Sequence, residues 1–129
     1  MYDHPGYVVR REAPLGEIGG ANQAYAKFTH FQKFRLNAVH YTVTTAGTSA
    51  ANNTQVINKI SGTTTTALGT MTAGTNAAGS RIDSASFTTN TNNPCSPGDI
   101  IQINQGADTV GKGAVVFEYE VLSDATQTT

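Results

Sequence analysis

Short runs of alternating apolar and polar residues, separated by turn signals, are the feature that most constrains the fold of this chain. The clearest run covers residues 113–122. A period of two residues is that of a strand with one buried face. The run is therefore predicted to turn its glutamates to water and to bury its apolar members, which are Val115, Phe117, Tyr119 and Val121.

Five further segments have the composition of β-strands. In the first of them, Phe34 and Leu36 have the opposite parity to the apolar residues from Val39 onward, which predicts a β-bulge near Ala38. The predicted strands cover residues 34–44, 55–60, 64–72, 81–89 and 99–104.

Turn signals recur roughly every 8–15 residues along the chain, which is typical of a β-sandwich or a small barrel. Examples are Asn-Asn at 52–53, Ser-Gly at 61–62 and Pro-Gly at 97–98. No segment has the period of an amphipathic helix. The residues alone leave three architectures open: a jelly roll, another Greek-key sandwich and a small barrel.

The first 32 residues lack this pattern and are predicted to form an extended arm. Pro-Gly at 5–6, Ala-Pro at 13–14 and Gly-Gly at 19–20 prevent a stable helix. The segment is nevertheless richer in apolar residues than a disordered linker. We expect a partner to bury these side chains; the alternative is an arm that folds back on its own domain. The predicted contact residues are Tyr7, Val8, Val9, Arg10, Arg11, Leu15, Ile18, Tyr25 and Phe28.

The resulting domain organisation is an arm over residues 1–32, a β-sandwich over 33–123 and a flexible tail over 124–129. The start of the chain has no apolar core of the kind that a signal peptide requires, and no apolar run is long enough to span a bilayer.

Charge is distributed unevenly along the chain. Residues 1–35 hold five of the eight Lys and Arg, whereas Lys59 is the only charged residue between 42 and 80. The formal net charge is −1, so no global field favours a nucleic acid or an anionic membrane as partner. Only 13% of the residues are charged, which suits a surface covered by neighbouring subunits. The arginines at 10, 11 and 35, with Lys27 and Lys33, favour contact with an acidic protein surface.

No motif for catalysis, metal binding or cofactor binding stands out. His4, His30 and His40 lack metal-ligand spacing, and no serine lies in a G-x-S-x-G elbow. The Gly/Thr-rich segments lack the lysine of a phosphate-binding loop. A single cysteine, Cys95, excludes an intrachain disulfide and is expected to be a half-buried residue beside a turn. We therefore predict a protein that is not an enzyme and that has no metal or cofactor.

The order of these strand and turn motifs resembles that of small structural proteins of tailed bacteriophages, in particular capsid cement, or decoration, proteins. The resemblance covers about residues 31–122 and lies in the rhythm of strands and turns. The segments that carry it are FQKF at 31–34, VTTAGTS at 43–49, LGTMTAG at 68–74, SPGD at 96–99, GADTVG at 106–111 and VVFEYEV at 115–121.

The resemblance implies a jelly-roll-like antiparallel β-sandwich preceded by an extended N-terminal arm. It also implies a protein made in the host cytoplasm and located on the outer capsid surface of the virion. There it would sit as a homotrimer at three-fold sites and clamp the major capsid protein. The same rhythm occurs in phage tail and fibre modules, so the alternative is a receptor-binding module that contacts a host glycan or protein.

Overall fold

The computed structural model describes residues 9–14, 17–84, 87 and 91–122, and within these ranges it contains β-strands and no helix. It therefore has no helix among the described residues that is long and apolar enough to cross a membrane. The strands are β1 (Val9–Glu12), β2 (Ile18–Gly19), β3 (Ala24–Thr29), β4 (Phe34–Thr45), β5 (Thr54–Ser61), β6 (Thr64–Thr72), β7 (Arg81–Asp83), β8 (Ile100–Gln105) and β9 (Lys112–Val121).

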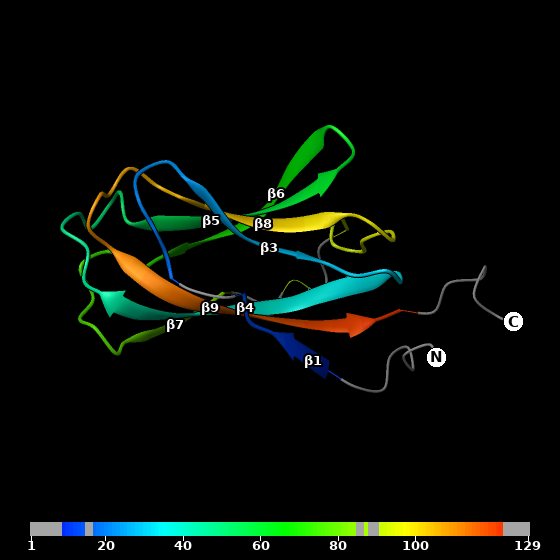
Figure 1. The fold of residues 1–129 in the computed structure, drawn as a ribbon, viewed down its shortest axis with the longest axis horizontal. Helices are drawn as coiled ribbons and strands as arrows, with labels where there is room; N and C mark the ends of the chain where they lie inside the picture. Colours follow the sequence, from blue (N-terminus) through cyan, green and yellow to red (C-terminus); the bar gives the residue numbers. More distant parts are fainter. Residues whose placement is uncertain (1–8, 15–16, 85–86, 88–90, 123–129) are drawn as a thin grey trace, which may run out of the picture.

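The strands form two antiparallel sheets that lie face to face, as the two layers of Figure 1 show. The first sheet has the order β1-β9-β4-β7, and β2 also pairs with β9. The second sheet has the order β3-β8-β5-β6. β1 and β2 lie along the same edge of β9, because Glu12 is opposite Phe117 and Ile18 is opposite Gly113. They are two halves of one interrupted edge strand.

This strand order is that of a jelly roll. With β1 and β2 taken as one edge strand, each sheet has four strands, and the chain crosses between the sheets at almost every connection. Only β5 and β6 are a hairpin within one sheet. Two Greek keys wound in this way distinguish a jelly roll from the other sandwiches and barrels. The structure thus confirms the jelly-roll-like sandwich.

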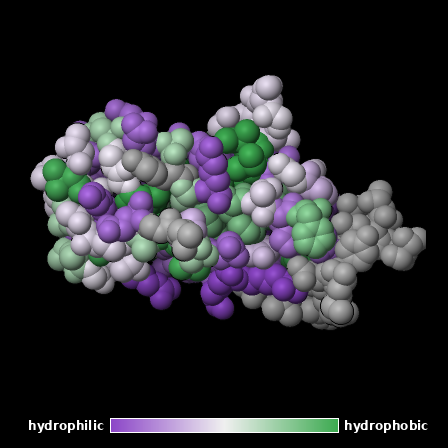
Figure 2. Space-filling model, in the orientation of Figure 1, coloured by the Kyte–Doolittle hydropathy of each residue, from purple (hydrophilic) through white to green (hydrophobic). Residues whose placement is uncertain are grey.

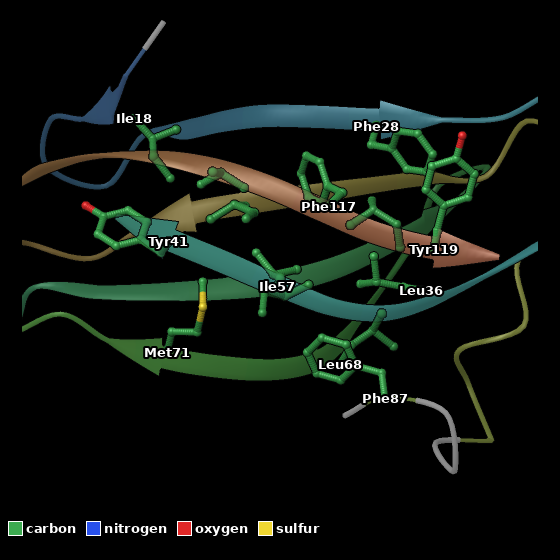
Figure 3. Packing of buried hydrophobic residues seen from close by; sticks show 14 of the residues in the cluster. Ile18, Phe28, Leu36, Tyr41, Ile57, Leu68, Met71, Phe87, Phe117 and Tyr119 are labelled. Atoms are coloured by element: carbon green, nitrogen blue, oxygen red, sulfur yellow. The ribbon is translucent and has the colours of Figure 1, made fainter. Parts of the chain in front are cut away.

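The core lies between the sheets and consists of the residues that alternation turns inward (Figure 3). The four apolar residues predicted for the last strand are all buried. Phe28 of β3 packs against Phe34, Phe117 and Tyr119, with ring centroids 5.3, 5.6 and 4.5 Å away. This aromatic cluster joins the second sheet to the two central strands of the first.

The predicted bulge in β4 is present. The register against β9 shifts between Leu36 and Ala38, so that Leu36 and Val39 both face the core. The side chain of Asn93 satisfies the main chain here: it accepts the Leu36 N–H at 3.0 Å and donates to the Leu36 carbonyl at 2.6 Å. The buried side chain of Asn93 therefore stabilises the bulge at which the register shifts.

The boundary predicted between an arm and a body needs correction. The described part of residues 1–32 pairs with the chain's own sheets, through β1 and β2 on β9 and β3 on β8. Ile18 and Phe28 are 4% and 6% exposed within the core. The arrangement observed is the alternative, a segment folded back on its own domain. It forms because each sheet gains an edge strand and the core gains two large apolar side chains.

Two further predictions are refined. The strand expected over 81–89 is β7, which ends at Asp83; Phe87 is buried, and residues 85–86 and 88–90 lie outside the described residues. The glutamates at 118 and 120 are half-buried and paired with cations instead of facing water. The tail over 124–129 also lies outside the described residues.

The packing of Tyr41 on Gly113 gives a test of this core. Tyr41 is fully buried, and a Cβ added at Gly113 would lie 2.1 Å from the Cζ of the Tyr41 ring. Gly113→Ala is expected to lower the free energy of unfolding by about 1–3 kcal/mol, because the ring has no free space to enter. Chemical denaturation measures the change. Ala114→Ser, at an exposed position of the same strand, is the control, and equal stability of the two variants would contradict this packing.

Candidate interaction surface

A network of charged side chains crosses the outer face of the first sheet from β1 to β7. Arg11 on β1 lies 3.5 Å from Glu118 on β9, measured from Nε to Oε2. Glu118 Oε2 lies 2.9 Å from Nε2 of His40 on β4. His40 Nδ1 lies 2.6 Å from Oδ1 of Asp83 on β7. The Asp83 carboxylate also accepts two hydrogen bonds from Arg81, one on each oxygen. One chain of contacts thus crosses all four strands of the sheet.

Strand register places these side chains together. Arg11 lies opposite Glu118, and His40 lies opposite Asp83, so each contact joins direct or diagonal neighbours on adjacent strands. A parallel contact joins Arg35 of β4 to Glu120 of β9, which are also opposite each other. Opposite charges at such positions stabilise a sheet modestly, by about 0.2–1 kcal/mol per pair.

His40 is the central member of the network. Burial alone would lower its pKa, but the hydrogen bonds to Asp83 and Glu118 and the charges of both carboxylates outweigh burial, so the pKa of His40 is raised. Bonding to Arg81 and then to His40 lowers the pKa of Asp83 to about 2. Both ring nitrogens of His40 are engaged by carboxylates. Neither is left to exchange a proton with a substrate, so the arrangement suits cross-linking of strands better than acid–base catalysis.

Two members of the basic cluster expected from the sequence, Arg11 and Arg35, are paired with Glu118 and Glu120. Arg81, outside that cluster, is paired with Asp83. These three arginines and three carboxylates balance, so together with His40 they carry a net positive charge only when His40 is protonated. Arg11 and Arg81 are still 65% and 64% exposed, and with Thr42 and Val116 they line a depression on this face. Figure 2 shows hydrophilic residues along the lower edge of the molecule, over the first sheet.

Those predicted contact residues that the structure describes do not gather on one surface. Tyr7, Val8 and Leu15 lie outside the described residues. Val9 and Tyr25 pair through their main chains with Glu120 and Ile103. In the same set, Arg10 and Arg11 lie on the edge strand β1, and Ile18 and Phe28 belong to the core.

The loops at one end of the sandwich are held by a carboxylate and by a buried amide cluster. Asp108 accepts four main-chain N–H bonds of 2.7–2.8 Å, from residues 48, 49, 110 and 111, and these bonds lower its pKa. Beside it, Asn53 accepts bonds from the buried amides of Gln55 and Gln105 and donates to the carbonyl of Gly74. These polar residues have structural partners within the chain.

Cys95 is fully buried, not half-buried as expected, and burial raises the pKa of its thiol to about 12. The thiol is therefore unreactive at neutral pH. Within the described part of the chain, no three His, Cys, Asp or Glu side chains are placed to hold a metal ion.

Sequence reasoning missed the network because its members are far apart in the chain. The two glutamates were predicted to lie on the outer face of the last strand, but neither the neighbour of each strand nor its register follows from one sequence. Comparison of the chain with protein-family models, with curated proteins and with solved structures finds no match.

The raised pKa of His40 predicts how stability depends on pH. The unfolded chain has a His pKa of about 6.5, so the stabilisation by His40 is complete below that pH and is lost as pH rises through the folded pKa. The difference in melting temperature between the native protein and His40→Gln should therefore be largest below about pH 6.5 and should shrink as the pH rises above it.

Thr42→Ser is the matched control, because it alters the next outward position of β4 without changing an ionisable group. Its effect on melting temperature should be independent of pH. A pH-independent difference for His40→Gln over the same range would contradict the proposed role of the imidazolium.

Proposed function

We propose that this chain is a structural protein of a virus particle and not an enzyme: a cement, or decoration, protein that binds the outer surface of a phage head and stabilises its lattice. The observation that supports this most is the jelly-roll order of the two sheets. Double-sheet jelly rolls recur in viral capsid proteins, in lectins and in cupins. The resemblance of residues 31–122 to cement proteins favours the first of these classes.

The use of polar groups supports the same choice. In the described residues, the side chains of Asn53 and Asp108 bond to the chain itself, and both nitrogens of His40 bond to carboxylates. Such a body is suited to bearing load, because its internal bonds fix loops and cross-link strands. As a cement protein it would contact the major capsid protein and, as the resemblance implies, assemble as a homotrimer at three-fold sites.

The part of the chain before β1 is the proposed contact with the shell. Tyr7 and Val8 lie immediately before this edge strand, and Arg10 and Arg11 lie on it. An extended segment that continues an edge strand can reach a neighbouring subunit and bond to its main chain. β1, β2 and β3 are strands of the sandwich, so within the predicted arm only the residues before β1 can be removed without damage to the core.

Deletion of residues 1–8 tests this function. The shortened chain should keep its melting temperature, because every described core residue remains, and it should lose co-sedimentation with phage heads that lack their cement protein. Deletion of 124–129 is the control and should leave binding intact. Full binding by the chain without residues 1–8 would contradict the proposed contact.

One observation favours the alternative, a tail-fibre or receptor-binding module. Phe31 is 65% exposed, and its ring stacks on that of His30 with a centroid distance of 4.7 Å and an interplanar angle of 20°. Exposed aromatic faces bind sugars and protein side chains.

If the chain is a receptor-binding module, the native protein should bind host cells and should not bind phage heads. Phe31→Ala should then reduce the cell binding at least tenfold. If the chain is a cement protein, the native protein should bind heads and should not bind cells, so Phe31→Ala should cause no change in cell binding. A cell-binding assay and head co-sedimentation on the same two proteins decide between the functions.

A further inference from the structure

The depression on the outer face of the first sheet is a candidate binding site that the strand cross-links leave open. It has a volume of about 360 Å³ and is lined by side chains from all four strands. Thr42 and His40 come from β4, and Val116 comes from β9. Arg11 and Arg81 come from β1 and β7, so the two arginines enter the depression from opposite edges of the sheet.

The lining has hydrogen-bond donors that the described residues do not occupy. Nε of Arg11 lies 3.5 Å from Oε2 of Glu118, which is longer than the distance of about 2.7–3.2 Å in an ordinary N–H···O bond. Arg81 donates to Asp83 through Nε and Nη2, and a guanidinium has further N–H groups on Nη1. In the described part of the chain, the Thr42 hydroxyl has no hydrogen-bond partner. These groups can all donate to an anion.

The charges around the depression favour an anion with a single charge. His40 is faced by Glu118 of β9 and by Asp83 and Arg81 of β7, and Arg11 of β1 lies beyond Glu118. At pH 6, below its raised pKa, His40 is largely protonated, so three cations face two carboxylates and a charge of +1 is left over. A second negative charge, as on a phosphate group, would be repelled by both carboxylates. A carboxylate carries one charge, and its two oxygens match the paired donors of a guanidinium.

We propose that the depression binds a carboxylate group on the surface of an acidic partner protein, with Arg11, Arg81 and Thr42 as donors. The side chains of the two arginines are 65% and 64% exposed, which leaves them within reach of such a partner. The net charge of the whole chain is −1, so it has no wide positive field of the kind that attracts a nucleic acid, and recognition is local. Naming the shell protein as the source of the carboxylate rests on the proposed function, whereas the site itself does not.

Acetate is the probe for the isolated chain, followed by NMR at pH 6 as acetate replaces chloride at constant ionic strength. The signals of the His40 ring and of the main-chain amides of Thr42 and Val116 should shift and saturate. Arg11→Gln and Thr42→Val should each weaken the affinity for acetate at least about threefold, because each removes donors to a charged group. Lys112→Gln removes a charge from an exposed position of β9 outside the depression and should keep the native affinity.

Three results would overturn the site. Shifts that do not saturate, or that scatter over the whole surface, would show that acetate does not bind in the depression, and the native chain alone decides this point. An unchanged affinity in both Arg11→Gln and Thr42→Val would exclude the proposed donors. Phosphate titrated in the same way should bind more weakly than acetate, and tighter binding would assign the depression to a phosphorylated ligand instead.

Co-sedimentation with phage heads that lack their cement protein separates this inference from the proposed function. Arg11→Gln should reduce binding to heads at least about threefold relative to the native chain, and Lys112→Gln should not. Equal binding by Arg11→Gln and the native chain would overturn the shell as the source of the carboxylate. No binding by the native chain, with acetate still bound in the depression, would contradict the proposed function and support the site alone.

Discussion

The packing of Phe28 between the sheets is the interaction on which the rest of the structure depends. Its ring contacts Phe34 and Phe117 and tilts against Tyr119, so β3 is joined to both central strands of the opposite sheet. Because Phe28 comes from the segment that begins the chain, this contact draws the first strands into the sandwich. The bulge in β4, stabilised by Asn93, places Leu36 and Val39 on the same side of the core as that cluster.

The two outer faces that result are chemically different. The first sheet carries a charge network in which His40 connects β9 to β7. The second sheet carries threonine, amide and aliphatic side chains near β6 and a lysine at its far edge. A charged face with satisfied pairs resists non-specific contacts. The difference fits a protein that is built into an assembly.

Much of the fold could be predicted from the sequence, because local patterns carry it. Period-two alternation located β4, β5, β6, β8 and β9 to within a residue or so at most ends, and the parity change located the bulge. The first segment was misjudged because prolines and glycines hid strands that only long-range pairing stabilises. The charge network was also out of reach, since it depends on which strands are neighbours, and a single sequence does not specify that.

We propose that this jelly roll is a structural component of a phage head, and imaging of the intact particle tests the proposal most directly. A cryo-electron microscopy reconstruction of virions that contain this chain should show the sandwich on the outer surface of the head lattice, with its first residues directed at the shell. Density for the sandwich at the tail or its fibres, with none on the head, would contradict the account.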